Sequence, residues 1–175
     1  MFDTQRVPVK VYRWDDEGAP QVESAAGSIK TILKACLVTG YGEGNKRKDG
    51  LGWEMAFEKA QEACFRSTHP KATKWWLGVD DSKYRSGSRY VDLCGLLEPT
   101  SAKAGKVKQK VNNSSGFHNF IYKTNDDSRD KIQWVVVGNE RAFTLIILWR
   151  DYCSFFIFGN FSSLAVADAA NTLLG

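Results

Sequence analysis

Two apolar segments in the C-terminal half constrain the fold more than any other part of the sequence. KIQWVVVG begins at Lys131 and RAFTLIILW begins at Arg141, and only Asn139 and Glu140 lie between them. Both segments are rich in β-branched and aromatic residues, which favour strands. Gly138 and the polar residues after it are typical of a tight turn. The pattern therefore predicts a β-hairpin.

Shorter segments show the alternation of apolar and polar residues that is typical of strands. In VPVKVYRW, the side chains of Val7, Val9 and Val11 fall on one face. We expect further strands in the segments WEMAF, KWWLGVDD, SRYVDLCGLL, HNFIYKT and SFFIFGN. The polar segment DDSKYRSG, which joins two of them, is predicted to be a turn.

Two other segments have the residue spacing of helices. The first predicts a helix over about residues 28–38, capped by Ser24 or Ser28 and ended by Gly40 or Gly42. Its apolar positions recur at spacings of three and four residues, at Ile29, Ile32, Leu33, Cys36 and Leu37. SSLAVADAANTLLG predicts a second helix over about residues 162–173.

The order of strand, helix, many strands and helix predicts the fold class. Consecutive strands favour a mostly antiparallel sheet, so we expect an α+β fold with an N-terminal and a C-terminal helix. At 175 residues, the chain has the length of a single domain, which we expect to span residues 1–175.

Composition limits the protein class. Hydrophobic residues make up 43% and charged residues 25%, as in an ordinary globular protein. The four cysteines have no C-x-x-C spacing and lie in apolar surroundings, so we expect buried free thiols in a reducing compartment. No apolar run approaches the length of about 18 residues that a membrane span needs. We therefore expect neither a membrane span nor a signal peptide.

The segment GYGEGNKRKDGLGW, from Gly40 to Trp53, contains five glycines and three consecutive basic residues. We call it the glycine loop. It follows a helix and has no Gly-Lys-Ser/Thr, whereas phosphate-binding loops precede a helix. We expect an exposed basic tip over residues 45–50, with Lys46, Arg47 and Lys48 as candidate interface residues.

A second basic segment lies between Pro99 and Asn125, where five lysines occur without an acidic residue. Such a segment could meet nucleic acid or an acidic protein surface. Its Ala, Gly and Ser content favours a flexible, solvated basic loop over residues 101–115.

We expect no catalytic, cofactor-binding or metal-binding residues, and hence no enzyme. His69 and His118 have no Cys, Asp or Glu at ligand spacing, and no G-x-S-x-G nucleophile motif occurs. Three acid pairs lie beside turn-forming residues, and we expect them to form turns. They are Asp15 with Asp16, Asp80 with Asp81, and Asp126 with Asp127.

Trp75 and Trp76 are adjacent, so on a strand their side chains face opposite sides and one of them is expected to be exposed. An exposed tryptophan could stack on a base or a sugar, or anchor a protein interface. We favour an interface, because tryptophan is enriched there.

Several short motifs are spread along most of the chain. They are GAP at 18–20, AAGS at 25–28, ACLVTGYG at 35–42, GW at 52–53, VDD at 79–81, FGNFSS at 158–163 and the terminal ADAANTLLG. In combination they resemble a family of structural proteins encoded by tailed bacteriophages and prophages. Members of the family often carry Asp after the late Phe-Gly, where this chain has Asn160. The segment from about residue 96 to 122 is outside the likeness.

The resemblance implies a virion structural protein, assembled in the bacterial host cytoplasm. It implies a minor capsid or decoration protein, a connector, or a tail or baseplate subunit, with identical subunits and other phage structural proteins as partners. It implies no catalytic residue and no cofactor. One alternative is a nucleic-acid-binding protein that uses the basic loops. Another is a small hydrolase or lectin-like binder that uses an exposed tryptophan and the acid pairs.

Overall fold

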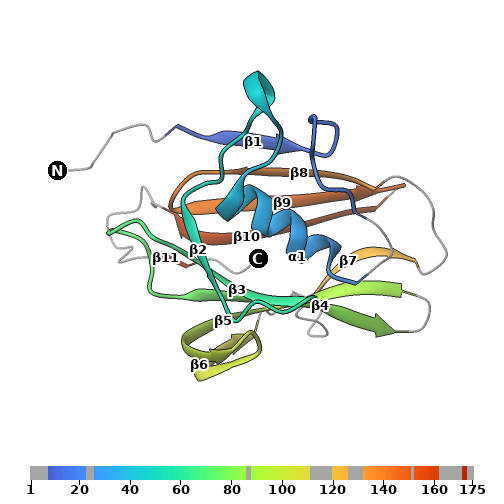
Figure 1. The fold of residues 1–175 in the computed structure, drawn as a ribbon. Coiled ribbons are helices and arrows are strands. Elements are labelled where there is room, and N and C mark those ends of the chain that lie inside the picture. The colour runs from blue at the N-terminus through green and yellow to red at the C-terminus, as the bar shows by residue number, and fades with distance from the viewer. Residues whose placement is uncertain are drawn as a thin grey trace.

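The computed structural model describes residues 8–22, 26–85, 88–110, 120–125, 132–150, 152–161 and 171–172. Most of these residues lie in strands, which form two antiparallel sheets. A short helix lies between the two sheets (Figure 1).

The first sheet, which we call the five-stranded sheet, joins the N-terminal strand to strands from the end of the chain. Its order is β1-β8-β9-β10-β11. The strands are β1 (Lys10–Arg13), β8 (Gln133–Gly138), β9 (Ala142–Trp149), β10 (Tyr152–Phe161) and β11 (Asn171–Thr172). The predicted hairpin is confirmed, because β8 and β9 pair antiparallel across a turn at Asn139.

The second sheet consists mainly of consecutive hairpins. Its strands are β2 (Trp53–Ala56), β3 (Glu62–Ser67), β4 (Trp76–Arg85), β5 (Ser88–Ser101) and β6 (Ala104–Lys110), in that order. β7 (Phe120–Asn125) pairs with the first part of β5, and β6 pairs with the last part. Neighbours in the sequence are mostly neighbours in this sheet, as short connections favour.

The helix predicted over about residues 28–38 is present. It consists of α1 (Ser28–Leu33), which continues as a π-helical segment, η1 (Lys34–Thr39). Gly40 ends it with a φ of 73°, in the region that favours glycine. A short 3-10 helix, η2 (Gly44–Lys46), follows in the glycine loop.

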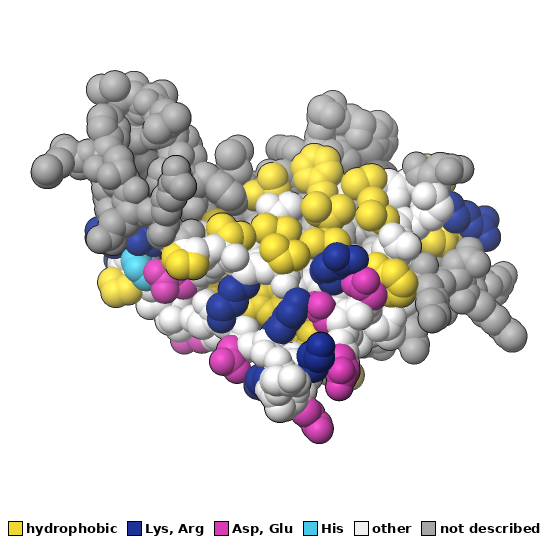
Figure 2. Space-filling model, turned by 90° about the horizontal axis from the view of Figure 1, so that it is seen from above, with side chains coloured by type: hydrophobic (Ala, Val, Ile, Leu, Met, Phe, Trp, Pro, Cys, Tyr) yellow, Lys and Arg dark blue, Asp and Glu magenta, His cyan; other side chains and the backbone are white. Residues whose placement is uncertain are grey.

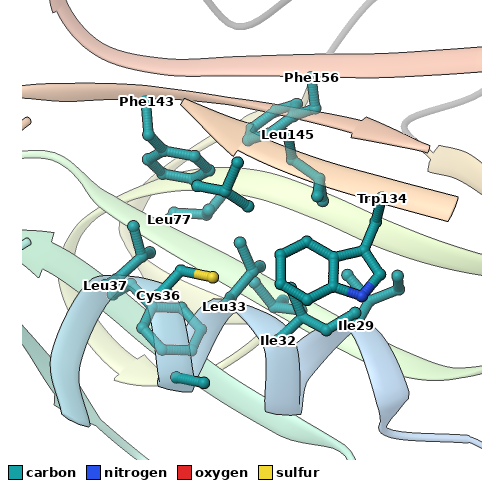
Figure 3. Packing of buried hydrophobic residues seen from close by; sticks show 14 of the residues in the cluster. Ile29, Ile32, Leu33, Cys36, Leu37, Leu77, Trp134, Phe143, Leu145 and Phe156 are labelled. Carbon is teal, nitrogen blue, oxygen red and sulfur yellow. The ribbon is translucent and has the colours of Figure 1, made fainter. Parts of the chain in front are cut away.

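The apolar side of the helix fills the space between the two sheets. Ile32 and Leu33 are fully buried and belong to one cluster with Leu77 of β4 and Trp134 and Leu145 of the five-stranded sheet. Figure 3 shows the helix side chains directed at these residues. Full burial of such a side chain contributes about 1.5–3 kcal/mol, so the helix is held mainly by this packing.

The expected α+β fold is wrong, because the described residues are mostly strand and, apart from the short η2, contain one helical segment of 12 residues. The C-terminal helix expected over about residues 162–173 lies mostly outside the described residues. Within that range, Asn171–Thr172 form β11, which pairs with Asn160 and Phe161 of β10. Pairing with the preceding strand overrides the local helical spacing at this position.

Two polar segments also differ from expectation. The predicted turn DDSKYRSG is mostly strand, since residues 80–85 continue β4. In the segment expected to be a flexible loop, 101–115, Ala104–Lys110 form β6, and residues 111–115 lie outside the described residues. β6 is an edge strand, and lysines are common on edge strands because they oppose pairing with other chains.

Candidate functional site

Two neighbouring strands of the five-stranded sheet are apolar on both faces. In β8, Trp134 and Val136 point into the core and are fully buried, while Val135 and Val137 alternate with them on the opposite face. β9 repeats the pattern with buried Leu145 beside outward residues that are also apolar. Strands of this kind are typical of sheets that are covered on both sides.

The strand register arranges the outward side chains in three rows across the sheet. We call these residues, together with Val9 just before β1, the outer face. The rows are Val11, Val137, Thr144 and Ile157; then Arg13, Val135, Ile146 and Phe155; then Gln133, Leu148 and Cys153.

Several apolar side chains of the outer face are strongly exposed. Val9 and Phe155 are each 57% exposed, Val11 is 46% exposed and Leu148 is 38% exposed. Figure 2 looks onto this side of the molecule and shows a continuous apolar area at its centre. Single exposed apolar residues are ordinary, but a contiguous patch marks an interaction site. The outer face is therefore our candidate functional site.

Basic residues border the outer face on the side of β1. Lys10 donates to the backbone carbonyls of Asp49 and Gly50, and three other basic residues have an acidic neighbour. Arg13 pairs with Asp15 at 2.9 Å, and Lys48 pairs with Asp16 at 2.7 Å. Arg47 pairs with Asp49 at 3.3 Å. Figure 2 shows dark blue and magenta side chains side by side along this border. The border is thus mostly charge-compensated rather than strongly basic.

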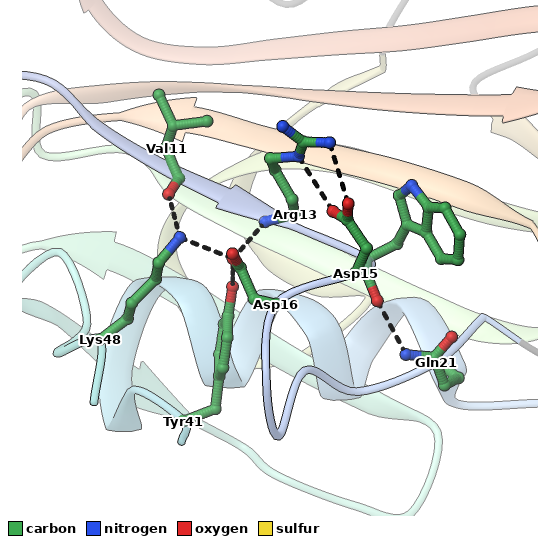
Figure 4. Close-up of polar contacts among 8 residues, drawn as sticks. Val11, Arg13, Asp15, Asp16, Gln21, Tyr41 and Lys48 are labelled. Carbon is green, nitrogen blue, oxygen red and sulfur yellow. Dashed lines mark hydrogen bonds and ion pairs between the residues drawn. The ribbon is translucent and has the colours of Figure 1, made fainter. Parts of the chain in front are cut away.

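Asp16 is the centre of a polar cluster that ties the glycine loop to β1 (Figure 4). Its Oδ2 accepts hydrogen bonds from the backbone N–H of Arg13 at 2.7 Å, the hydroxyl of Tyr41 at 2.6 Å and the ammonium of Lys48 at 2.7 Å. Burial raises the pKa of Asp16, but these hydrogen bonds outweigh it and hold the pKa below its usual value. Asp15 and Asp16 lie in a turn after β1, as predicted.

Two of the three basic residues of the glycine loop, Arg47 and Lys48, have partners within the chain. Lys48 also donates to the carbonyl of Val11 at 3.0 Å, and Arg47 donates to the carbonyl of Thr39 at 2.6 Å. Lys46 lies exposed at the end of η2. Of the three candidate interface residues, the structure places Lys48 in the Asp16 cluster and leaves Lys46 toward solvent.

Trp76 is the first residue of β4, in the second sheet, Trp75 lies directly before it, and both are partly buried. Trp75 packs against the main core. Trp76 packs against the small core cluster that includes Cys64, and the Arg66 guanidinium lies 4.6 Å from the centre of its ring. Neither tryptophan belongs to the outer face, which lies on the other sheet.

Asp80 and Asp81 are buried within β4, so the prediction that they form a turn is wrong. Asp81 Oδ2 accepts the backbone N–H groups of Ile29 at 2.7 Å and Lys30 at 3.2 Å. It thereby caps α1 in place of the expected serine. Its other oxygen pairs with the buried ammonium of Lys123. Asp81 thus joins the helix to β4 through the two N–H groups and joins β4 to β7 through Lys123.

A small cavity of about 190 Å³ lies beside β4, β5 and β6. The ammonium of Lys103, one of its lining groups, lies 2.5 Å from Glu62 Oε1 and 3.5 Å from Asp80 Oδ2. The hydrogen bond from Lys103 to Glu62 raises the pKa of Lys103. On β6, Lys106 pairs with Glu98 at 3.0 Å. These lysines of the second basic segment therefore have acidic partners within the chain.

Three of the four cysteines, Cys36, Cys64 and Cys94, are buried free thiols, as expected. Burial raises the pKa of Cys64 to about 12. Cys153 differs from the prediction, because it is exposed on the outer face. Its position on β10 alternates with buried residues, so the strand directs it outward.

Of the two histidines that we expected not to bind a metal, His118 lies outside the described residues. His69 Nδ1 accepts the backbone N–H of Lys71 at 3.1 Å, and its Nε2 lies 3.2 Å from Glu140 Oε1. Within the described part of the chain, no three His, Cys, Asp or Glu side chains are grouped as a metal site requires. No helix among these residues has both the length and the apolar character to cross a membrane.

The sequence indicates the outer face through unbroken apolar runs, which a search for alternating apolar and polar residues does not detect. VVV at 135–137 and LIIL at 145–148 are unbroken apolar runs. On a strand, such a run places apolar side chains on both faces, so it predicts a second apolar face in addition to the core face.

Comparisons with known proteins give no family for the chain. No protein-family model matches it. No curated protein and no solved structure matches it with statistical support.

Proposed function

We propose that this protein is a structural subunit of a tailed-bacteriophage particle and that it acts by protein–protein assembly through the outer face. Its partners are identical copies and other structural proteins of the particle. Its location is the virion, and it is assembled in the cytoplasm of the bacterial host.

The outer face is the observation that carries this proposal. Its centre is apolar, and exposed Phe155, Val11 and Leu148 are spread over three strands. Full burial of a large apolar side chain is worth about 1.5–3 kcal/mol, and a few such anchors dominate most protein interfaces. A partner that covers this face therefore gains substantial binding free energy.

The motifs that resemble the phage family lie at joints of the fold. Gly27 of AAGS has a φ of 91° and donates its N–H to the carbonyl of Asp81 in the VDD motif, at 3.0 Å. The side-chain amide of Asn160 donates to the carbonyl of Lys71 at 2.7 Å, which a carboxylate at that position could not do. The Asn160 contact is thus a departure from the family pattern, and the assembly argument rests on the outer face.

The geometry favours protein contact over nucleic-acid binding. Phosphate recognition requires basic side chains that can exchange counterions for phosphates. Arg47 and Lys48 instead bond to Thr39, Asp16 and the backbone of β1. Arg47 and Lys48 are therefore engaged within the chain, whereas Lys10 and Lys46 have no acidic partner among the described residues at this border.

The test is the abundance of the protein in purified virions, measured by quantitative mass spectrometry against the major capsid protein. The informative variant is Val11→Asp on the outer face. Val107→Asp on β6 is the matched control, because Val107 is 45% exposed and Val11 is 46% exposed. We expect Val11→Asp to reduce incorporation at least about tenfold, since a buried charge weakens an apolar interface by more than 1.4 kcal/mol. Val107→Asp should be incorporated like the wild type.

Absence of the wild-type protein from the particle would contradict the proposed function. If the protein is present, its copy number locates it. Hundreds of copies per particle identify a capsid decoration protein, and about three to twelve copies identify a neck or baseplate subunit, following the closed symmetries of such assemblies.

A further inference from the structure

We propose that the outer face binds a second copy of this chain, sheet against sheet, with β10 of one copy over β1 of the other. This inference rests on the proposed function, because it names the first partner of the same surface.

The area of the outer face suits a stable dimer. The exposed fractions of Val9, Val11, Leu148 and Phe155 amount to about two whole side chains, which at about 150–250 Å² each offer about 300–500 Å² of apolar area. Exposed Arg13 and Gln133, at the ends of two rows, extend this area. Stable interfaces bury about 800 Å² on each partner. The outer face therefore supplies the apolar centre of such an interface, and the polar residues around it supply the remaining area.

The charge at the border suits a neutral partner. Arg13, Lys48 and Arg47 are each paired with an aspartate of the same chain. Paired charges of this kind attract a polyanion or an anionic membrane only weakly. A second copy has the same charge-paired border around the same apolar centre. The two borders therefore do not repel each other, and the two apolar centres cover each other.

The free edge of β1 is occupied, which directs association to the face of the sheet. The Lys48 ammonium donates to the Val11 carbonyl, and the Tyr12 hydroxyl donates to the Asp49 carbonyl at 2.6 Å. The glycine loop thus contacts β1 where it crosses the strand (Figure 1). Bonds of this kind remove the edge as a template for another strand. Face-to-face packing remains, as in sandwiches with sheets about 10 Å apart.

Side-chain size selects the orientation of the two copies. The outer face is lined by small valines on β1 and by bulky Phe155 and Ile157 on β10. A two-fold axis parallel to the strands, between β8 and β9, places β10 of one copy over β1 of the other. Large residues then face small ones, as close packing requires. In this arrangement Ile157 meets Val11 of the second copy, and Phe155 meets Arg13, a favourable cation–ring contact.

The first experiment measures the mass of the full-length protein by light scattering after size exclusion, over a range of concentrations. We expect twice the chain mass of 19.6 kDa for the wild type and for Val107→Asp. For Val11→Asp we expect the monomer mass, with an unchanged circular dichroism spectrum that shows it is folded. A monomeric wild type at every concentration would overturn the proposal, and so would a dimeric Val11→Asp.

The second experiment tests the orientation by disulfide cross-linking in a Cys153→Ser background. Val11→Cys and Ile157→Cys are combined in one chain. Within the chain, β8 and β9 separate the two positions by about 14 Å, too far for a disulfide. We expect mild oxidation to link the double variant into covalent dimers. The two single variants should link much less, and equal linking by a single variant would contradict the orientation.

The proposed function and the proposed dimer can each be contradicted without the other. If the wild type is monomeric in solution but enters virions, and Val11→Asp does not, then self-association is wrong and the outer face binds another particle protein. If the wild type is dimeric but absent from virions, the dimer stands and the proposed function is wrong.

Discussion

At the scale of single residues, Asp81 is a buried carboxylate whose contacts hold two elements in place. It is 1% exposed, caps α1 through two backbone N–H groups and pairs with Lys123, which is also 1% exposed. Buried ion pairs add little compared with an apolar pair, but breaking one is costly because a charge is left in the interior. Asp81 therefore connects the position of the helix to the position of β7.

We expect Asp81→Asn to lower the free energy of unfolding by about 3–5 kcal/mol, because it removes the carboxylate that faces the buried Lys123 ammonium. Urea unfolding followed by circular dichroism measures this. Asp15→Asn is the control, since Asp15 pairs with Arg13 at the surface and should change stability little. Adding Lys123→Met to Asp81→Asn should recover part of the loss. A loss no larger than that of Asp15→Asn would show that the buried pair is not required.

At the scale of elements, the glycine loop connects the helix end to the edge of the five-stranded sheet. Tyr41 and Lys48 pair across the loop through backbone hydrogen bonds of 3.0 and 2.9 Å. Gly50 lies so close to the backbone of Val38 that a Cβ would come within 2.6 Å of its carbonyl oxygen. The glycines serve this close approach, and the basic residues hold the loop against β1 and the turn that follows it.

The cluster around Asp16 predicts a pH dependence of stability. Its pKa in the folded state lies below the usual Asp value of about 3.9, so its contribution is complete above that value. The contribution is lost as the pH falls through the folded-state pKa. We expect Asp16→Asn to lower the unfolding free energy at pH 7 by about 1–3 kcal/mol, the range for hydrogen bonds to charged groups. The gap between variant and wild type should close as the pH falls below 4.

Urea unfolding at pH 7 and at acid pH measures this gap. Asp49→Asn serves as the control, because the Asp49 side chain is 81% exposed and should change stability little at either pH. A gap of the same size at both values of pH would mean that the Asp16 charge does not hold the glycine loop.

At the scale of the whole molecule, the two sheets enclose the helix and one core, while the outer face of one sheet stays exposed. The inner side of that sheet contributes fully buried Trp134, Phe156 and Phe158 to the core. A sheet that is apolar on both faces but covered by the chain on one has free energy left to gain from association. Assembly would cover this second apolar face of the sheet.

We expect the melting temperature of the wild type to rise with protein concentration, because dissociation precedes or accompanies unfolding of a dimer. Val107→Asp should behave in the same way. Val11→Asp should melt at a temperature that does not depend on concentration. Differential scanning fluorimetry over a wide concentration range measures this, and a constant wild-type melting temperature would argue against association of the folded state.

The sequence by itself determined most element positions. The hairpin of β8 and β9 and the helix after Gly27 follow from period-two and three-to-four spacings, which are local properties of a chain. The turn at Asp15 and Asp16 follows from the local preference of Asp for turns. Such elements are predictable because neighbouring residues decide them.

The tertiary structure alone decided how the elements combine and which residues form the candidate site. Asp81 could not be recognised as a helix cap, because its partner Ile29 lies 52 residues away. Ala104–Lys110 became a strand by pairing with β5, and Asn171–Thr172 by pairing with β10. The outer face exists because the register aligns β1 with three strands from the other end of the chain. Strand pairing, between near or distant segments, depends on the whole fold, and local spacing does not contain that information.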